Sequence, residues 1–303
     1  MLLSARFPTV SLSLFNSRRM RLWTALVIGT VAILGMQALM PEWQFLPGMS
    51  QAAAWAPLAI FLAALVCEYM DSSLGMGYGT TLTPLLILAG FEPLQIVPAV
   101  LLSELLTGAT AGFMHHRDGN INFLRDRRAR RTALLLTALS AVGTLLAVWL
   151  AISISKFWLG IFITAIVLAM GVLILATRNR QIPYRSGSIL TVGAVAAFNK
   201  GLSGGGYGPL VTAGQVVSGL PAKHAVAITS VAESLTCAIG VAGYLAVGKT
   251  IDWTLAVPLV LGAMLSVPMA TVTVRSMRER TMRGLVGLAT CALGLVALIK
   301  LMG

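Results

Sequence analysis

The chain alternates between long apolar runs and short polar stretches. A helix of about 20 apolar residues is long enough to cross a lipid bilayer. The runs that fit this length are Leu22–Met40, Ala53–Leu74, Leu94–Met114, Thr132–Ile154, Phe157–Thr177, Ala222–Val247, Thr254–Val274 and Leu285–Met302. The pattern therefore predicts an all-α polytopic membrane protein.

Two further apolar runs, Thr80–Phe91 and Pro209–Leu220, are much shorter. About a dozen residues are too few to cross an average bilayer upright, so we expect each run to form a half-helix or a re-entrant arm. The stretch Ser188–Leu202 leads into the second arm. With these short pieces, the chain is predicted to have about 9 to 11 membrane segments.

A glycine cluster precedes each short run. The first cluster is Leu74–Gly79, and the second is Ser203–Gly208, 129 residues later. Residues that match at this offset are Asp71 with Lys200, Tyr78 with Tyr207, Thr83 with Thr212, Glu104 with Glu233, and Gly119 with Gly248. Shared apolar composition would not keep these residue types in register, so we predict an internal duplication.

The composition agrees with a membrane protein and changes the meaning of the charge. Of the 303 residues, 57% are apolar and 11% are charged, and the mean hydropathy is +0.87, outside the range of soluble domains. A net charge of +12 would suggest a nucleic-acid partner in a soluble chain. Here the basic residues lie between apolar runs without the interleaved aromatic residues that stack on bases, so no nucleic-acid partner is predicted.

The arginines fall into four clusters, which the positive-inside rule places in the cytoplasm. The clusters are Arg6–Arg21, Arg117–Arg131, Arg178–Arg185 and Arg275–Arg283. The chain then divides into a basic cytoplasmic tail (1–21), an extra transmembrane helix (22–40), a first repeat (53–177) and a second repeat (182–303) whose C-terminus lies outside. The first repeat enters from outside and the second from the cytoplasm, and such an inverted repeat is typical of secondary transporters.

The two glycine clusters form the predicted substrate site. Broken helices at membrane depth occur where the freed backbone lines a cavity or is buried in protein. Exposed N–H groups and the positive ends of half-helices favour an anion. The candidate substrate-binding residues are Gly75, Gly77, Tyr78, Gly79, Lys200, Ser203, Gly204, Gly205, Gly206, Tyr207 and Gly208. The alternative is that the glycines serve helix packing and the tyrosines cap the bends.

Ionisable residues inside apolar runs are functional candidates, because they cost several kcal/mol unless they are paired. Asp71 and Lys200 can form an ion pair, or Lys200 can contact the anion directly, and Glu68 lies near Asp71 in the sequence. Glu104 and Glu233 can carry protons in a coupled cycle or accept structural hydrogen bonds. Coupling to H⁺ or Na⁺ and uniport both remain open.

The histidines and cysteines have simpler expected roles. His115 and His116 begin an arginine-rich loop and are expected to be solvated, while His224 is expected to be a satisfied histidine at the edge of a span. The three cysteines lie inside apolar runs and are expected to be small buried hydrophobes. No catalytic residue, metal-ligand set or organic cofactor is predicted.

Three motifs occur in order along the chain: the first glycine cluster with Pro84 beyond it, the loop His115–Asn122, and the second copy Lys200–Gly208. From about Ala53 to the C-terminus the chain resembles the sulfite exporter TauE/SafE family. The resemblance implies an inner-membrane transporter of small sulfur-containing anions such as sulfite, thiosulfate, sulfoacetate or sulfolactate. Met76, which interrupts the first glycine cluster, and the extra span 22–40 depart from the commoner family pattern.

Other functions use the same features. An anion channel can be built on the same site, and Gly201–Gly204 matches the Gly-x-Ser-Gly box of rhomboid proteases, with Ser203 as nucleophile and His224 as its partner. A catalytic dyad would not explain a duplicated chain, so the sequence favours a transporter that works by alternating access and is not an enzyme. An inside-negative membrane drives out each negative charge with about 2.3 kcal/mol per 100 mV, so export needs no coupled ion. No sequence feature specifies an oligomeric state.

Overall fold

The computed structural model describes residues 18–39, 55–91, 93–150, 156–177, 207–246 and 248–302, together with single positions between 179 and 196. Over these residues the chain is helical and contains no strand, which confirms the predicted all-α fold. The helices are α1 (Arg18–Leu39), α2 (Ala56–Leu74), α3 (Tyr78–Leu88), α4 (Pro93–Arg117), α5 (Arg127–Leu150), α6 (Lys156–Thr177), α8 (Tyr207–Val217), α9 (Ala222–Ala246), α10 (Trp253–Ser276) and α11 (Glu279–Met302). The predicted substrate-binding residues Lys200 and Ser203–Gly206 lie outside the described residues.

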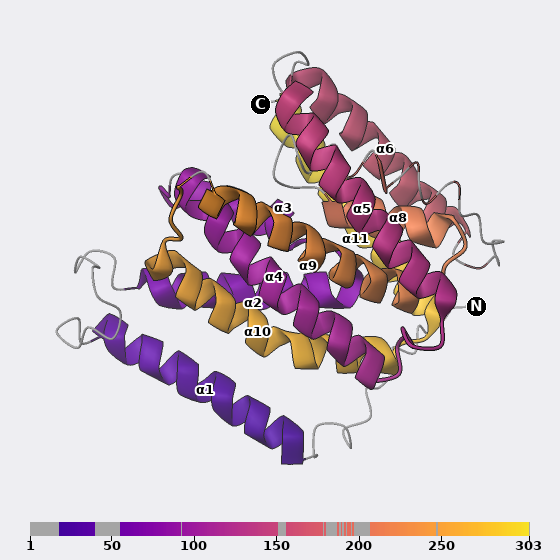
Figure 1. The fold of residues 1–303 in the computed structure, drawn as a ribbon. Helices are drawn as coiled ribbons and strands as arrows, with labels where there is room; N and C mark the ends of the chain where they lie inside the picture. The colour runs from indigo at the N-terminus through magenta and orange to yellow at the C-terminus, as the bar shows by residue number, and fades with distance from the viewer. Residues whose placement is uncertain are drawn as a thin grey trace, which may run out of the picture.

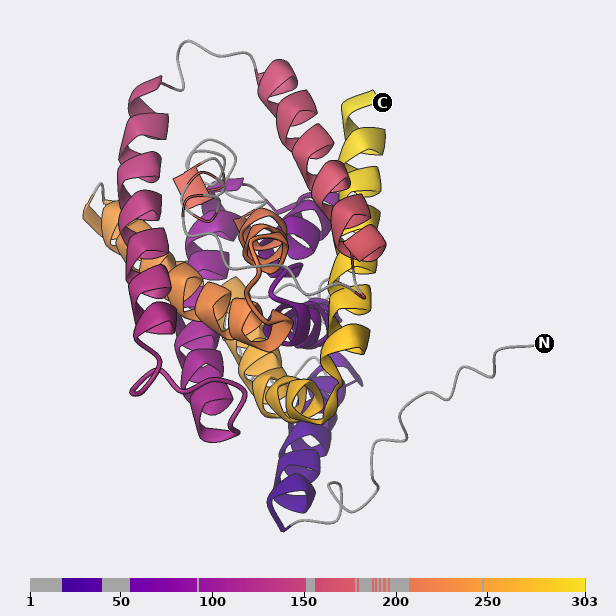
Figure 2. The same ribbon diagram turned by 90° about the vertical axis from the view of Figure 1, so that its right-hand side faces the viewer.

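Two groups of helices meet at α8. In the first group, α10 packs along α2 and α4, and α4 packs along α9 (Figure 1). In the second group, α11 packs along α6 (Figure 2). Helix α5 contacts α9 of the first group. The short helix α8 contacts α6, α9 and α11, so it lies where the two groups join. Helix α1 lies at the edge of the first group, where Trp23 Nε1 donates a hydrogen bond to the Leu265 carbonyl.

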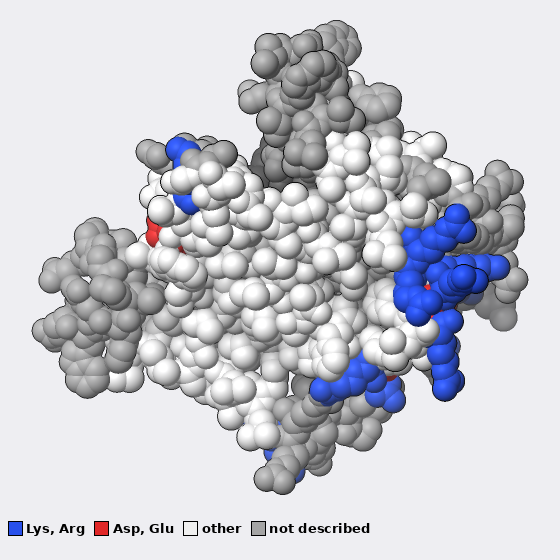
Figure 3. Space-filling view, viewed as in Figure 1, with Lys and Arg blue, Asp and Glu red and all other residues white. Residues whose placement is uncertain are grey.

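The distribution of charge suits a lipid bilayer. Among the described helices, α2, α9, α10 and residues Gln95–Arg117 of α4 are long and apolar enough to cross a membrane. On the face in Figure 3, Lys and Arg gather at one end of the bundle, and the surface between the ends is almost free of charge. We call this end, which includes the loop His115–Arg131 and the segment Arg275–Arg283, the basic end. Charged ends with an uncharged belt between them are expected when the belt faces lipid.

The backbone repeats at the offset found in the sequence. Helices α3 and α8 have 11 residues each and α4 and α9 have 25 each, and within each pair the first residues are 129 positions apart. The turns repeat as well: Gly90 and Gly219 both have φ 92°, while Gly119 and Gly248 have φ 77° and 73°. These left-handed conformations end a helix with little strain only at glycine. The repeat therefore extends from residue types to helix ends.

The repeated helices α4 and α9 pack against each other in antiparallel directions. Their contacts run from Leu101 with Gly240, through Leu105 with Ser234, to Gly112 with Val231. The Ser234 hydroxyl donates to the Leu105 carbonyl at 2.8 Å, and these two residues are themselves 129 positions apart. The two copies of the repeated helix thus lie against each other and run in opposite directions.

Candidate functional site

The first helix break lies between α2 and α3. Helix α2 ends at Leu74 and is capped by Gly75, which has a left-handed φ of 72° and donates its N–H to the Asp71 carbonyl. Gly77 has φ 128°, and α3 begins at the next residue, Tyr78. Backbone conformations with positive φ favour glycine. The cluster therefore breaks the helix where the sequence predicted a break.

The first break touches the start of α8. The Thr212 hydroxyl donates to the Gly75 carbonyl at 2.7 Å. A Cβ atom on Gly208 would lie 2.7 Å from the same carbonyl oxygen and 3.0 Å from Met76 Cα. Only glycine lets the two backbones approach this closely. One glycine from each cluster is thus in contact with the other cluster's backbone, although the two are far apart in the sequence.

A buried polar network continues from this contact into α9. The Thr212 hydroxyl lies 2.9 Å from Thr229 Oγ1, and Gln215 Nε2 donates to the same Thr229 oxygen at 2.8 Å. All three side chains are buried, and within the described part of the chain Gln215 Oε1 has no hydrogen-bond partner. Sequence reasoning gave none of these residues a role. The available signal was a Thr and a Gln in a short run that is otherwise apolar.

Tyr78 and Tyr207 are the first residues of α3 and α8, and both are buried. The Tyr78 hydroxyl lies 2.7 Å from Ser103 Oγ, whereas the Tyr207 hydroxyl accepts a hydrogen bond from Ser140 at 2.9 Å. The two tyrosines are repeat partners, but the serines that they contact are not. Each ring is therefore anchored to a different neighbouring helix at the point where a half-helix starts.

Asp71 lies beside the first break. Its Oδ1 atom is 3.4 Å from the N–H of Tyr78, the first residue of α3. A carboxylate at this position interacts favourably with the positive end of the helix, and it occupies the place from which an anion would approach α3. The predicted partner of Asp71, Lys200, lies outside the described residues.

Acidic side chains from α2, α4 and α9 come together next to the break. Glu68, Glu104 and Glu233 are 2%, 6% and 7% exposed. Glu68 and Asp71 lie close enough to each other, and to Glu104 and Glu233, to interact electrostatically. Glu68 Oε1 accepts a hydrogen bond from Ser72 at 2.5 Å, but Glu68 Oε2 has no partner among the described residues. A buried carboxylate is costly unless it is paired or takes up a proton.

The position of Glu104 also explains why residue 79 of the first cluster is a glycine. A Cβ atom on Gly79 would lie 2.8 Å from Glu104 Oε1, and Cys237 Sγ donates to Glu104 Oε2 at 3.2 Å. The carboxyl groups do not form a metal centre: over the described ranges, no three His, Cys, Asp or Glu side chains are grouped so that they could hold a metal ion. Gly79 thus gives room to a buried acid of the neighbouring helix.

His115 was predicted to be solvated, and this prediction is wrong. Its side chain is fully buried, with Nε2 2.9 Å from the Ser72 carbonyl and Nδ1 3.0 Å from Asn120 Nδ2. Since the amide nitrogen of Asn120 donates, Nδ1 accepts and Nε2 carries the hydrogen, which makes the ring neutral. His116 is only half-buried, with Nδ1 3.3 Å from the Ile121 carbonyl.

The reason for the burial of His115 is that the following loop folds back onto α10. Asn120 donates a second hydrogen bond, to the Thr271 carbonyl at 2.9 Å, and Asp118 accepts one from the Thr271 hydroxyl at 2.8 Å. Gly119, in its left-handed conformation, makes the turn between them. The loop is therefore a folded part of the bundle.

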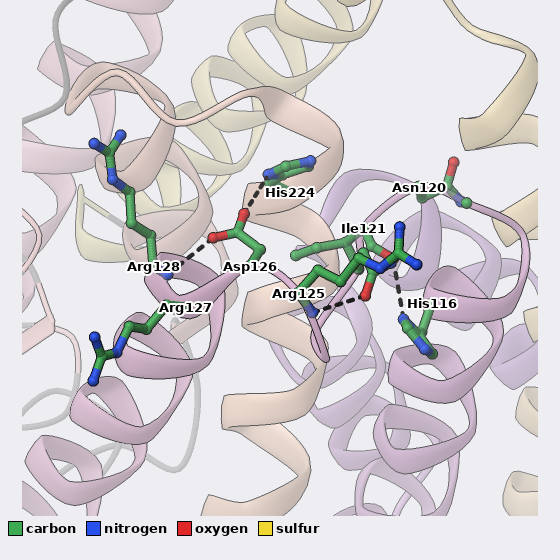
Figure 4. A pocket seen from close by; sticks show the side chains of 10 residues that line it. His116, Asn120, Ile121, Arg125, Asp126, Arg127, Arg128 and His224 are labelled. Carbon is green, nitrogen blue, oxygen red and sulfur yellow. Dashed lines mark hydrogen bonds and ion pairs between the residues drawn. The ribbon is translucent and has the colours of Figure 1, made fainter.

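A pocket of about 760 Å³ opens at the basic end, between this loop and the start of α9 (Figure 4). Its lining residues are His116, Gly119, Asn120, Ile121, Asn122, Arg125, Asp126, Arg127, Arg128 and His224. Asp126 Oδ1 accepts from the N–H groups of Arg128 and Ala129 and so caps α5, while Oδ2 lies 3.6 Å from His224 Nδ1. We call this the basic pocket. It joins a loop of the first half to a residue of the second.

Arg283 is a residue that sequence reasoning assigned only to a cytoplasmic arginine cluster. It lies in the second turn of α11 and is 7% exposed. Its Nε and Nη2 atoms are buried without a hydrogen-bond partner in the described part of the chain. The sequence signal was its spacing of three and seven residues from Val286 and Thr290, which places it on the same face of the helix.

Comparison with known proteins identifies relatives over most of the chain. A family model described as "Sulfite exporter TauE/SafE" matches residues 60–297. The chain is also 26% identical over 235 residues to the "Probable membrane transporter protein YtnM" of Bacillus subtilis (strain 168), which covers 74% of this chain and 76% of that protein. No solved structure matches the chain.

Proposed function

The chain belongs to the sulfite exporter TauE/SafE family, and on this premise we propose that it is a secondary transporter that exports small sulfur-containing anions such as sulfite, thiosulfate or sulfoacetate. Membership in this family supports a membrane transporter over an enzyme. The observation that carries the proposal is the contact of Gly208 with the backbone of Gly75 and Met76, because it brings the start of α8 against the first helix break.

The start of α8 is the part of this place best suited to an anion. At α3 the first N–H group faces the carboxylate of Asp71. Before α8 the sequence has the glycines 204–206, with Ser203 and Lys200 upstream, so it supplies backbone N–H groups, a hydroxyl and an ammonium group. An anion at a helix N-terminus is stabilised by the N–H groups and by the helix dipole. We therefore assign substrate binding mainly to the second break, with the backbone of Gly75 and Gly77 opposite it.

The antiparallel packing of α4 on α9 supports two halves of opposite orientation. A pseudo-two-fold axis near Leu105 and Ser234 would cross the helices, as in transporters built from inverted repeats. In this proposal the basic end faces the cytoplasm, the N-terminus is cytoplasmic, the C-terminus is outside, and the inner membrane is the site of action. Alternating access then consists of rocking the halves around the junction of α8 with the first break, and the membrane potential drives the anion out.

The opposite orientation of the halves is tested by labelling single cysteines in intact cells. Arg125, after α4, and Lys249, after α9, are both exposed. We expect Lys249→Cys to react with a membrane-impermeant maleimide added outside, and Arg125→Cys to react only after the membrane is permeabilised. Labelling of both positions from the same side would contradict the inverted arrangement.

The transport activity is tested in proteoliposomes with labelled sulfite, thiosulfate and sulfoacetate, and with sulfate as comparison. We expect saturable flux and counterflow with at least one sulfur anion, and loss of flux in Lys200→Gln but not in the control Lys249→Gln. Flux that does not saturate and shows no counterflow would indicate an anion channel. Cleavage of a labelled peptide that is lost in Ser203→Ala would instead support the protease alternative.

A further inference from the structure

We propose that Arg283 is an anion-binding residue on the basic-end side of the first helix break, where it binds the oxyanion group of a sulfite, sulfonate or phosphate. The proposal rests on the proposed transport function for its place in a transport path, but its binding chemistry is independent of it. It follows from the burial of the guanidinium, the two nitrogens that lack partners, and the face of α11 on which the residue lies.

The guanidinium of Arg283 is buried along one edge, and no described residue accepts a hydrogen bond from that edge. Nε and Nη2 have no hydrogen-bond partner, and the residue is 7% exposed. A buried charge without a partner costs several kcal/mol. Arginine does not relieve this cost by losing its proton. An opposite charge bound at the same place would relieve it.

The geometry of the unpartnered atoms specifies the kind of ligand. Nε and Nη2 form one edge of the planar guanidinium and point two N–H groups in nearly parallel directions. Such an edge matches two oxygen atoms of one carboxylate, sulfonate, sulfite or phosphate group in a bidentate pair. A halide offers this edge one acceptor atom instead of two, and a cation is repelled by the guanidinium. The ligand class is therefore a small oxyanion or an oxyanion headgroup.

The face of α11 that carries Arg283 leads to the first helix break. Thr290, seven residues further on, donates its hydroxyl to Met76 Sδ at 3.5 Å. Val286, between them, belongs to the same buried apolar cluster as Met76. Residues at spacings of three and seven lie on one side of a helix. Arg283 therefore lies on the face that touches the break, about 10 Å back along the helix axis.

The same face of α11 also leads to the basic end. One turn before Arg283, Glu279 Oε1 accepts a hydrogen bond from the N–H of Ala222, the first residue of α9, at 2.9 Å. His224, two residues further along α9, lines the basic pocket. Along α11 the order is thus the start of α9, then Arg283, then the break. An oxyanion held at Arg283 is placed between the basic pocket and the glycine clusters.

The test compares anion binding in the purified full chain with variants at two arginines of the same segment. Arg283→Met removes the buried charge, Arg283→Lys keeps the charge without the two-nitrogen edge, and Arg280→Met is the control because Arg280 is exposed. The probes are sulfite, sulfoacetate, inorganic phosphate, chloride and a short-chain phosphatidylglycerol. The readouts are thermal unfolding with each probe and the KM for flux in proteoliposomes.

We expect the oxyanions, but not chloride, to raise the unfolding midpoint of the wild type and of Arg280→Met. Arg283→Met should unfold no earlier than the wild type without anion, because an unpartnered buried charge is gone. Its oxyanion affinity should fall about tenfold or more, and Arg283→Lys should fall between the two. Stabilisation by phosphatidylglycerol but not by the free anions would assign the site to a lipid headgroup.

The outcomes separate this inference from the proposed function. If the wild type transports a sulfur anion and Arg283→Met keeps both its affinity and its KM, the role of Arg283 is refuted and the transport function stands. If the wild type binds oxyanions through Arg283 but transports none, the binding site stands and the transport function fails. If no oxyanion stabilises the wild type, Arg283 is not an anion site.

Discussion

The contact between the two helix breaks is tested most directly by adding one methyl group to Gly208. In Gly208→Ala the new Cβ would lie 2.7 Å from the Gly75 carbonyl oxygen and 3.0 Å from Met76 Cα. Real Cβ atoms do not approach backbone atoms so closely, so α8 must move away from the first break. Overpacking of this kind costs about 1–3 kcal/mol. The movement also lengthens the Thr212–Gly75 hydrogen bond, which is 2.7 Å.

The matched control is Gly243→Ala in α9, where a new Cβ would meet no atom within 4 Å. Both substitutions replace a helical glycine by alanine and so share a similar gain in helix propensity, up to about 1 kcal/mol. The difference between them therefore isolates the clash. We expect a lower unfolding midpoint and a lower rate of sulfite flux for Gly208→Ala, and wild-type values or higher for Gly243→Ala. Equal midpoints and equal rates in both variants would refute the view that the breaks pack backbone on backbone.

Three further predictions follow from hydrogen bonds at the site. Thr212→Val leaves the buried Gly75 carbonyl without its donor and should cost about 1–3 kcal/mol of stability. Thr212→Ser keeps the hydroxyl and should cost less. Thermal unfolding measures both variants, and equal losses of stability would contradict the role of the hydroxyl. Asp126→Asn keeps an acceptor for the first turn of α5 and loses only the pair with His224, so its free energy of unfolding should fall by less than about 1 kcal/mol. Asp126→Ala also removes the helix cap and should lose up to about 2 kcal/mol. Equal losses in the two variants would mean that the ion pair, and not the cap, stabilises the protein. Glu68→Gln removes the acid whose Oε2 is buried without a described partner, and it should abolish any acceleration of flux by an imposed pH gradient; an undiminished effect would place proton coupling elsewhere.

Helix positions, helix ends and the repeat were predictable from the sequence because they depend on nearby residues. Runs of about 20 apolar residues predicted the long helices, and the glycine cluster at Gly75–Gly79 predicted the break after α2. A left-handed φ at Gly75, Gly119 and Gly248 is a local property of the residue type. The offset of 129 residues was visible in matched residue types and returns in the bounds of α3 and α8.

The tertiary structure decided which side chains meet, because those contacts depend on how helices far apart in the chain pack. Tyr78 and Tyr207 are equivalent in the sequence, yet one contacts Ser103 and the other Ser140. His115 has the sequence surroundings of a solvated histidine and is buried, since the loop after it folds onto Thr271 of α10.

The burial of Arg283 could not be predicted from the sequence either. Its sequence neighbours mark it as one more cytoplasmic arginine, and only the packing of α11 within the bundle buries its Nε and Nη2 atoms. The meeting of Gly75 with Gly208 likewise required both halves to be folded. Residue type and periodicity determined where the helices run and break, whereas burial and partner choice came from the close packing of helices that no local pattern encodes.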